Sequence, residues 1–415
     1  MFRNKIALRF GEDGPVLRVV KITDRCLLTT TDMDEGRPRG DGEPLKTLRR
    51  IRPGNASQQK LNRHSPLFGL NAVRMPIDRR LGLGLAAGCG LATLYSLREG
   101  GWLREFLWHR FAPWHLVGFV SDIYIYPLKS GRGERVESAE CSAEVMTSGE
   151  LRDRSLLVWD SEKNVKLTAR EAPALVTVTT SISGNCLTLK APAQRSMPEL
   201  ILNLDSVIAE DSRRSVQLWF EGEIEGLDCG DWAGSWLEAL TGKPCLRLLY
   251  HPPNGLCSNR RFVAADEPRI AALARREDKA IFQDLGVCMA LSKQSLAELN
   301  SRLKKPVSVR NFRPNIVFDG LDRPFAEDSW KEVRIGEVEF ANVKPCTRCV
   351  LTTVDPELGL KSEDGQPLKE LQIFRMADDN DPYKPVYGSS PLFGINLAVN
   401  IPGKIATFDP VYARI

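Results

Sequence analysis

Cys349 is the residue of this chain that most clearly indicates a specific chemistry. It ends the motif Cys346-Thr-Arg-Cys349, with Lys344 two residues before the motif begins. A thiolate is a soft metal ligand, and the thiol must lose its proton to bind. The neighbouring Arg348 and Lys344 favour that deprotonated form. The motif therefore indicates a thiol that can bind a metal or react.

The chain contains an imperfect second copy of this stretch near its start. Residues 21–32 (KITDRCLLTTTD) match residues 344–355 (KPCTRCVLTTVD), and DGEPLK at 41–46 matches DGQPLK at 364–369. SPLFG at 65–69 is repeated at 390–394, so three blocks recur in the same order. This order indicates an internal duplication. The copy keeps a cysteine opposite Cys349, namely Cys26, but has Thr23 opposite Cys346.

Three other interpretations of the cysteine pair remain open. A zinc site needs four ligands, and the chain has no second CxxC and no HxxxH motif. A dithiol redox pair is expected to open a helix, whereas a β-rich Val-Leu-Thr-Thr-Val run follows this pair. Two inert core cysteines are the third possibility.

A second group of residues is suited to binding anions. Lys129-Ser130 follows YIYPL, Arg154 lies in LRDRSLLVWD, and Arg313 lies in RNFRPNIV. Arginine binds phosphate or carboxylate through two hydrogen bonds, while lysine acts as a point charge. Each residue alone is typical of a solvated surface. Together with a thiolate, they predict a site for an anionic, phosphate-bearing metal cofactor.

The composition excludes several classes of protein. At 415 residues, with 42% hydrophobic and 27% charged residues, the chain is long enough for two or three globular domains. Its net charge of +4 gives no reason to expect nucleic acid as a partner. Ten scattered cysteines favour reduced, intracellular thiols, and four well-separated histidines argue against a histidine-rich metal site.

Short strands outnumber helices in the predicted pattern. Residues 119–127 alternate like a strand, residues 177–189 predict a hairpin turning at Gly184-Asn185, and residues 216–225 predict another strand. Helices are expected at 232–240, ending at Gly242, and at 294–303, capped by Ser292. This pattern favours a β-barrel architecture with α-helical additions.

The N-terminal part holds the short copy and an apolar segment. Residues 1–74 lack a partner for the closing segment GKIATFDPVY, so we expect them to be poorly ordered or to lean on the rest of the chain. Residues 81–97 (LGLGLAAGCGLATLYSL) carry no charge and predict a membrane anchor, with a buried soluble helix as the alternative. An aromatic and basic segment, residues 102–116, follows that stretch.

Several motifs resemble those of the MOSC family, and within it those of the mitochondrial amidoxime-reducing components. In chain order they are YPLKS, LRDRSLLV, LSKQSLAELNSRL, NFRPNIV, EDSWKEVRIGEVEF, CTRCVLTTVDP, YGSSPLFG and DPVY, spanning about residue 118 to the C-terminus. The resemblance implies a β-rich mixed α/β fold, in which a MOSC β-barrel follows an N-terminal MOSC-associated β-barrel or α+β domain and a membrane-anchor helix. The domains would be a partial and non-functional duplicate (1–74), an anchor and linker (75–116), the N-terminal barrel domain (117–245) and the MOSC domain (246–415).

The resemblance also implies a molybdenum–molybdopterin cofactor with Cys349 as the metal ligand. The cofactor contacts that it implies are Lys129, Ser130, Arg154, Arg313, Thr347, Arg348 and Tyr387. The chain departs from the family pattern at Asp284-Leu-Gly286, where relatives carry a small polar pair after the aspartate. In the N-terminal copy Asn62 stands where Tyr387 is expected, so we do not expect that copy to hold a cofactor.

The activity implied by the resemblance is reduction of N-hydroxylated compounds such as amidoximes, hydroxylamines and N-oxides. Electrons would come from NADH through cytochrome b5 reductase and cytochrome b5. The protein would be anchored in the outer mitochondrial membrane through residues 81–97 and would face the cytosol. The alternatives are a MOSC protein that delivers sulfur to a molybdenum cofactor, and a membrane-tethered cofactor carrier without reductase activity.

Overall fold

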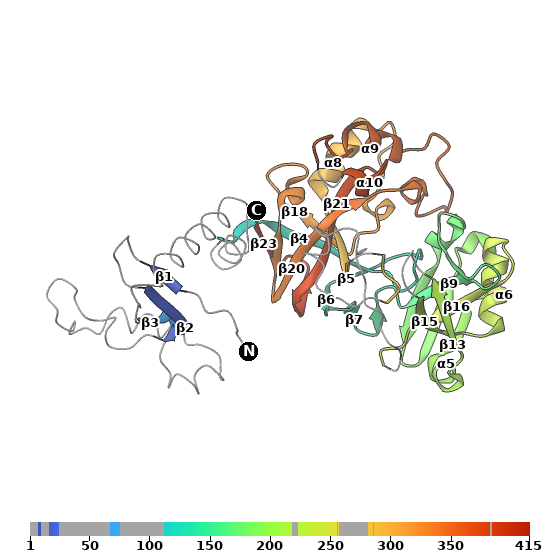
Figure 1. Cartoon of the computed structure of the whole chain (residues 1–415). Helices are drawn as coiled ribbons and strands as arrows, with labels where there is room; N and C mark the ends of the chain where they lie inside the picture. The colour runs from blue at the N-terminus through green and yellow to red at the C-terminus, as the bar shows by residue number, and fades with distance from the viewer. Residues whose placement is uncertain are drawn as a thin grey trace. The chain divides into compact units, whose positions relative to one another are not determined.

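The computed structural model describes residues 7–9, 16–24, 67–74, 112–217, 223–254, 256, 281–284, 286–381 and 384–415. The chain divides into two compact units, residues 1–111 and 112–415 (Figure 1). In the first unit the described residues form one antiparallel sheet of β1 (Ala7–Arg9), β2 (Val16–Asp24) and β3 (Leu67–Arg74). The other residues of that unit, including the predicted anchor 81–97 and most of the segment expected to be poorly ordered, lie outside the described residues.

The short sheet repeats the strand pairing of its counterpart near the C-terminus. The counterpart is formed by β20 (Val338–Thr347) and β21 (Leu392–Ile401). In β2–β3, Leu17 pairs with Arg74 and Asp24 pairs with Leu67. The equivalent positions pair in the same way: Phe340 with Val399, and Thr347 with Leu392. The duplication inferred from sequence therefore extends to backbone register.

The first half of the second unit is built on a closed five-stranded barrel. Its strands are ordered β10 (Val165–Leu167), β14 (Arg213–Gln217), β15 (Glu223–Asp228), β16 (Leu246–Tyr250) and β9 (Leu156–Asp160). Beside it lies a three-stranded sheet of β11 (Thr179–Ser183), β12 (Cys186–Lys190) and β13 (Leu200–Asn203). The short helices η2 (Pro173–Thr177) and η3 (Ala193–Arg195) and the helices α5 (Leu204–Glu210) and α6 (Asp231–Thr241) complete this half. A continuous core packs α6, through Trp236 and Leu237, onto these strands.

The second half contains a seven-stranded barrel. The sheet order is β18 (Ile316–Asp319), β17 (Cys288–Ser292), β21, β20, β19 (Glu332–Ile335), β23 (Pro410–Arg414), β4 (His115–Ile125) and β5 (Glu134–Val136). An additional β18–β4 pairing closes seven of these strands into a ring and leaves β5 outside it. Figure 1 shows the cyan β4 lying among the orange and red strands. The barrel interior is filled by apolar side chains such as Ile123, Phe340 and Ile395.

Smaller elements surround this barrel. A four-stranded sheet joins β22 (Gly403–Ala406) to β6 (Ser138–Cys141), β7 (Met146–Ser148) and β8 (Leu151–Arg152). The helices are α8 (Lys293–Arg302), η4 (Val309–Asn311), η5 (Ala326–Ser329), η6 (Val350–Thr353), α9 (Leu368–Phe374) and α10 (Lys384–Tyr387). Gly394 in β21 has a φ of +79°, and a Cβ there would lie 2.6 Å from the carbonyl oxygen of Ala290. This close approach explains why glycine is needed at the end of the repeated SPLFG motif.

Most of the predicted elements are confirmed. The strand at 119–127 is β4, and the hairpin at 177–189 is β11–β12, turning at Gly184 with a φ of +58°. Helix α6 ends at Gly242 in the left-handed conformation, and Ser292 caps α8 by accepting a hydrogen bond from the Ser295 N–H. The single strand predicted at 216–225 is wrong. Residues 216–217 belong to β14 and residues 223–225 to β15, which pairs antiparallel with it, because hydrophobic alternation does not reveal where the chain reverses.

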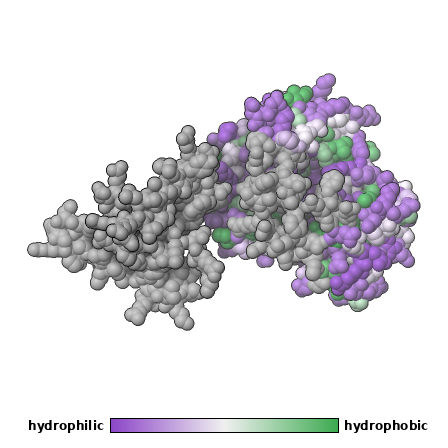
Figure 2. Space-filling model, viewed as in Figure 1, coloured by the Kyte–Doolittle hydropathy of each residue, from purple (hydrophilic) through white to green (hydrophobic). Residues whose placement is uncertain are grey.

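The visible surface of the second unit is mainly hydrophilic, with scattered hydrophobic side chains (Figure 2). Among the described residues, no helix has both the length and the apolar character needed to cross a membrane. The predicted β-rich mixed α/β fold with closed barrels and few helices is confirmed for that part of the chain.

Candidate functional site

Cys349 lies in a turn between the end of β20 and the short helix η6. Its backbone is extended, and its carbonyl oxygen accepts a hydrogen bond from the Thr352 hydroxyl at 2.9 Å. Asn311 donates to the carbonyl oxygens of Thr352 and Val354, at 3.2 and 3.3 Å. Asn311, two residues before Arg313, therefore helps to fix the turn that carries the thiol.

Arg348 holds this turn against the second barrel. Its guanidinium group donates to the carbonyl oxygens of Phe393 at 2.7 Å and Phe312 at 2.9 Å, and it contacts the Met289 sulfur at 3.2 Å. Arg348 is buried, and burial lowers the pKa of its guanidinium group. The side chain therefore positions the neighbouring thiol mainly through two backbone carbonyl oxygens, those of Phe312 and Phe393.

The two cysteines of the motif have different surroundings. Cys346 packs against the apolar cluster that contains Leu299, Phe312 and Phe393. Cys349 is partly exposed and hydrogen-bonds with the side chain of Arg170. Burial lowers the pKa of Arg170, but the interactions with Cys349, Asp284 and Glu171 together outweigh burial and raise that pKa. Both cysteines are partly exposed, and they differ in that Cys346 lies against apolar side chains whereas Cys349 lies beside a guanidinium group.

Lys129 and Ser130 follow β4 and enter the same region. Both are buried, at 5% exposure each. The Lys129 ammonium group donates to the Phe282 carbonyl oxygen at 2.7 Å and to Asp284 Oδ1 at 2.6 Å. Asp284 also interacts electrostatically with Arg154, Arg313, Lys166 and Arg170. One carboxylate therefore faces several positive side chains.

Arg154 and Arg313 share one aromatic ring. Their guanidinium carbons lie 4.6 and 4.4 Å from the centroid of the Tyr126 ring. Arg154 pairs with the fully buried Asp153 at 2.6 Å and donates to Asn315 at 3.0 Å. Burial lowers the pKa of Arg313 to about 10, whereas Asp153 outweighs burial at Arg154 and raises its pKa. The two arginines therefore differ in how fully the protein compensates their charge.

Three of the predicted site residues have left-handed backbones. The φ angles are +71° at Ser130, +50° at Arg154 and +55° at Arg313. Such conformations cost free energy in residues other than glycine, and they concentrate where a structure must aim a particular side chain. These conformations occur in three separate loops. The surrounding fold therefore stabilises strained backbone in each loop and fixes the direction of these three side chains.

Lys166 and Arg170 are functional candidates that the sequence did not single out. Lys166 lies in β10 and Arg170 in the turn after it, both in the first half of the unit. Burial, assisted by the charge of Lys129, lowers the pKa of Lys166 to about 8. Lys166 and Arg170 lie near the site because of the way the first barrel folds. No sequence motif predicts that position. The signal in the sequence is a cation in a short strand, as Lys166 is in β10, which resembles the placement of Lys129 after β4.

Thr347 and Tyr387 flank the site from the second half. Thr347 is the last residue of β20 and pairs with Leu392. Tyr387 ends α10 and packs with Ala377 and Leu392, with the Lys344 ammonium group 5.7 Å from its ring centroid. The structure thus places both residues beside the start of β21, which pairs with the strand leading to Cys349.

The charges of these side chains determine which kind of ligand the site can bind. We call Lys129, Arg154, Lys166, Arg170 and Arg313 the cation cluster; Asp153 and Asp284 are the carboxylates in contact with it. An excess of positive charge beside a thiol suits a ligand that carries an anionic group and a soft metal. No group of three potential metal-ligating His, Cys, Asp or Glu side chains occurs in the described part of the chain.

The sequence matches two family descriptions in the regions that build this site. The MOSC N-terminal beta barrel domain matches residues 117–244, and the MOSC domain matches residues 278–412. The class defined by the fold and site is therefore that of two-part MOSC proteins, with the cation cluster supplied by both parts.

The sequence identity to individual relatives identifies a family within the MOSC proteins. Mitochondrial amidoxime-reducing component 1 of Homo sapiens is 40% identical over 80% of this chain and 92% of its own length. The Mus musculus component 1 is 37% identical, covering 83% of this chain and 96% of its own length. Mitochondrial amidoxime reducing component 2 of Homo sapiens is 34% identical, with 85% and 98% coverage. The chain belongs to the family of mitochondrial amidoxime-reducing components.

Proposed function

We propose that this protein is a molybdenum-cofactor-dependent reductase of N-hydroxylated compounds, including amidoximes, hydroxylamines and N-oxides. The observation that carries the proposal is the meeting of Cys349 with cationic side chains from both MOSC parts. The names of the relatives support the same class of substrate.

The described residues fit such a cofactor. Cys349 would ligate the metal, while Lys129, Arg154 and Arg313 would neutralise the phosphate of the pterin. Lys166 and Arg170 add positive charge on the side of the first barrel, and the buried Nη2 of Arg313 has no hydrogen-bond partner among the described residues. Ser130, Thr347, Arg348 and Tyr387 complete the proposed set of contacts. When bound, the cofactor supplies a metal centre that exchanges electrons and takes oxygen from a nitrogen–oxygen bond.

The protein's own groups would perform the remaining tasks. Arg348 holds the thiol-bearing turn in place through backbone carbonyls, so that the metal is presented in one orientation. Arg170 hydrogen-bonds with the side chain of Cys349 and places positive charge beside it. The paired Asp153 keeps Arg154 oriented across the Tyr126 ring.

Electron supply and location are part of the same proposal. Electrons would come from NADH through cytochrome b5 reductase and cytochrome b5. The protein would reside in mitochondria, as the names of its relatives suggest. Attachment to the outer membrane through residues 81–97, with the catalytic part in the cytosol, is a further prediction.

The first test is the molybdenum and pterin content per chain in protein made by cofactor-replete cells. Near-stoichiometric amounts are expected in the wild type and in Cys346→Ala, and almost none in Cys349→Ala. Equal content in Cys349→Ala and wild type would contradict the ligand assignment. A wild type without molybdenum would contradict the proposed cofactor.

A second test measures NADH oxidation with an aromatic amidoxime, cytochrome b5 and its reductase. Turnover that disappears in Cys349→Ala supports a reductase. A protein that retains cofactor but shows no turnover would favour the carrier or sulfur-delivery alternatives.

A further inference from the structure

The side chain of Tyr126 contacts two arginines of the cation cluster at the same time. The guanidinium carbons of Arg154 and Arg313 lie 4.6 and 4.4 Å from the centroid of its ring. A cation over an aromatic ring is attracted by the negative face of the ring, and the attraction is stronger away from water. Tyr126 is 1% exposed, so its ring is removed from water. One buried ring therefore attracts two cations that lie far apart in the sequence.

The main chain of Tyr126 is bound to the segment that carries Arg154. The Tyr126 N–H donates to Asp153 Oδ1 at 2.9 Å, and the Tyr126 carbonyl oxygen accepts from the Arg154 N–H at 2.7 Å. The fully buried carboxylate of Asp153 also pairs with the Arg154 guanidinium group at 2.6 Å. Tyr126, Asp153 and Arg154 therefore form one connected unit, and the Tyr126 ring joins Arg313 to it.

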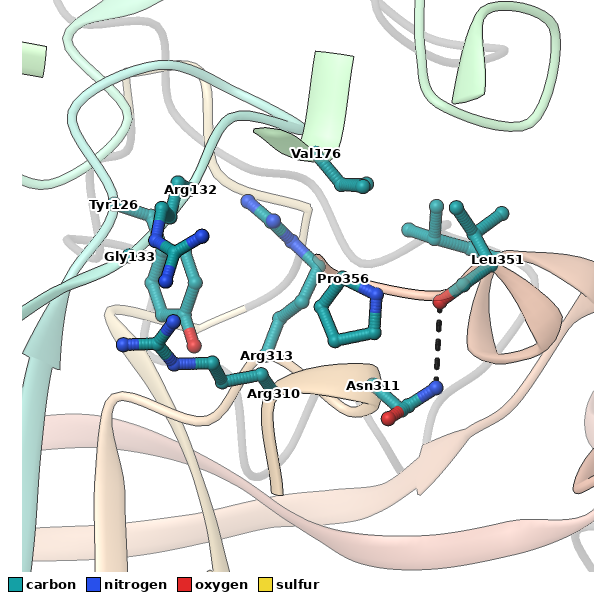
Figure 3. Close-up of a pocket in the computed structure, with 10 residues that line it drawn as sticks. Tyr126, Arg132, Gly133, Val176, Arg310, Asn311, Arg313, Leu351 and Pro356 are labelled. Atoms are coloured by element: carbon teal, nitrogen blue, oxygen red, sulfur yellow. Dashed lines mark hydrogen bonds between the residues drawn. The ribbon is translucent and has the colours of Figure 1, made fainter. Parts of the chain in front are cut away.

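The Tyr126 ring has little freedom to move away from the arginines. A Cβ on Gly133 would lie 2.4 Å from Tyr126 Cε1, closer than a Cβ approaches another heavy atom in proteins. Figure 3 shows Tyr126, Gly133 and Arg313 at a small pocket that all three help to line. Because glycine has no side chain, the chain at residue 133 closes tightly on the ring and fixes its place.

Arg154 and Arg313 need a shared partner because their charges repel each other. Burial lowers the pKa of Arg313 to about 10, and the positive charge of Arg154 acts in the same direction. Both residues also have left-handed backbones, with φ angles of +50° and +55°, which cost free energy in residues other than glycine. An anion gains most from two cations whose directions are fixed before it binds. The ring that both arginines contact is the group that can fix those directions together.

We propose that Tyr126 is a positioning residue for anion binding, whose ring holds Arg154 and Arg313 in the orientation in which both can donate to one phosphate group. The identity of that phosphate, as part of a molybdenum–pterin cofactor, rests on the proposed function. The role of the ring follows from contacts within the protein. The Tyr126 hydroxyl, which is buried and has no hydrogen-bond partner among the described residues, is dispensable in this role.

The experiment measures the affinity of full-length, cofactor-free protein for inorganic phosphate by isothermal titration calorimetry. Tyr126→Leu should weaken phosphate binding about tenfold, because the attraction of both arginines to the ring is lost. Tyr126→Phe keeps the ring and should bind phosphate as the wild type does. Gly133→Ala should weaken binding about threefold, because the added methyl group displaces the ring. Partial unfolding lowers the number of sites per chain and not their affinity, so the same titration separates misfolding from lost positioning.

Tyr124→Leu is the matched control. Tyr124 is 7% exposed, packs in the same apolar cluster as Tyr126, and has its ring centroid 6.3 Å from that of Tyr126. Its ring is not the one over which Arg154 and Arg313 lie. The same loss of an aromatic ring at this position should therefore leave the affinity for phosphate unchanged.

Four results would overturn the proposal. Unchanged affinity in Tyr126→Leu would show that the ring is not needed, and a loss in Tyr126→Phe equal to that in Tyr126→Leu would assign the effect to the hydroxyl. An equal loss in Tyr124→Leu would indicate a general effect of packing in this cluster. A wild type that does not bind phosphate would show that the two arginines are not arranged for an anion.

The proposed cofactor is tested separately on the same variants, made in cofactor-replete cells. Molybdenum and pterin content per chain should fall in Tyr126→Leu and stay at the wild-type level in Tyr126→Phe and Tyr124→Leu. A wild type that binds phosphate but contains no molybdenum would contradict the proposed function and leave the role of Tyr126 intact. The two proposals therefore fail in different measurements.

Discussion

The segment around Cys349 and its N-terminal copy around Cys26 share a sequence motif but differ in the residues that the rest of each copy supplies. Both copies have the arginine–cysteine pair and the Leu-Thr-Thr run, and the strands on either side pair in the same register. The residues that contact the Cys349 turn come from elsewhere: Arg170 from the first barrel, and Asn311 and Phe312 from the segment before β18. The duplication did not include counterparts of these residues.

This difference shows that the repeated motif supplies a thiol and the frame of a turn, but not a complete site. The positive charge beside the thiol is contributed by five side chains spread along the sequence from Lys129 to Arg313. A copy of about 75 residues brings none of them. The function of the motif therefore depends on the barrels to which it is attached.

The largest effect should separate the two cysteines. Cys349→Ser is expected to abolish molybdenum and pterin binding, whereas Cys26→Ser should leave both unchanged, because the cation cluster lies beside Cys349 and the copied sequence has no counterparts of its residues. Metal analysis of the two purified variants measures this directly. A comparable loss in Cys26→Ser would mean that the copy contributes to the site.

Arg154→Met should destabilise the fold by about 3–5 kcal/mol, because it leaves the fully buried carboxylate of Asp153 without its ionic partner. Urea unfolding of cofactor-free protein provides the measurement. Arg135→Met is the control, since Arg135 is 60% exposed and pairs with Asp122 at the surface, and its effect should stay below about 1 kcal/mol. Similar values for the two variants would contradict the structural role of the Asp153 pair.

Arg348→Met should cost about 2–3 kcal/mol, because two buried carbonyl oxygens lose a charged donor. The corresponding change in the copy, Arg25→Met, should leave cofactor content unchanged. Hydrogen exchange should show faster opening of residues 347–353 in Arg348→Met. Protection equal to that of the wild type would indicate that other contacts hold the turn.

The smallest effect concerns the pH dependence of stability. The pKa of Lys166 is about 8 in the folded protein and higher in the unfolded chain. Between pH 8 and the ordinary lysine pKa the unfolded state binds more protons, so this residue makes stability rise with pH in that window. Lys166→Gln should flatten the rise in cofactor-free protein and increase stability at pH 7. An unchanged slope would contradict the shift.

Local features of the fold were readable from sequence, and pairings across the chain were not. Ser292 and Gly242 mark helix ends through their own backbone chemistry, and Gly184-Asn185 marks a hairpin. The two strands within residues 213–228 were merged because both continue the same alternation. Closure of the large barrel depends on β4 pairing with β18 and β23, which lie far from it in sequence.

The site residues likewise divide into those that sequence motifs predicted and those that depend on contacts between distant parts of the chain. Motif resemblance identified Lys129, Arg154, Arg313 and Cys349, which the structure brings to one region. Lys166 and Arg170 were missed because a solvated cation and a site cation look alike until the barrel around them is known. Arg348 was predicted as a cofactor contact, but its side chain is engaged by protein carbonyls, so its proposed contact with the cofactor stays a prediction.

The pairing of β4 with β23 also determines when the large barrel can fold during synthesis of the chain. Strand β4 begins at His115, yet its neighbour β23 ends only at Arg414. The large barrel therefore cannot close while β23 is still inside the ribosome, and contacts so distant in sequence form late. Deletion of β23 would leave the same strand edge open. Cofactor loading is thus expected to follow the synthesis of β23.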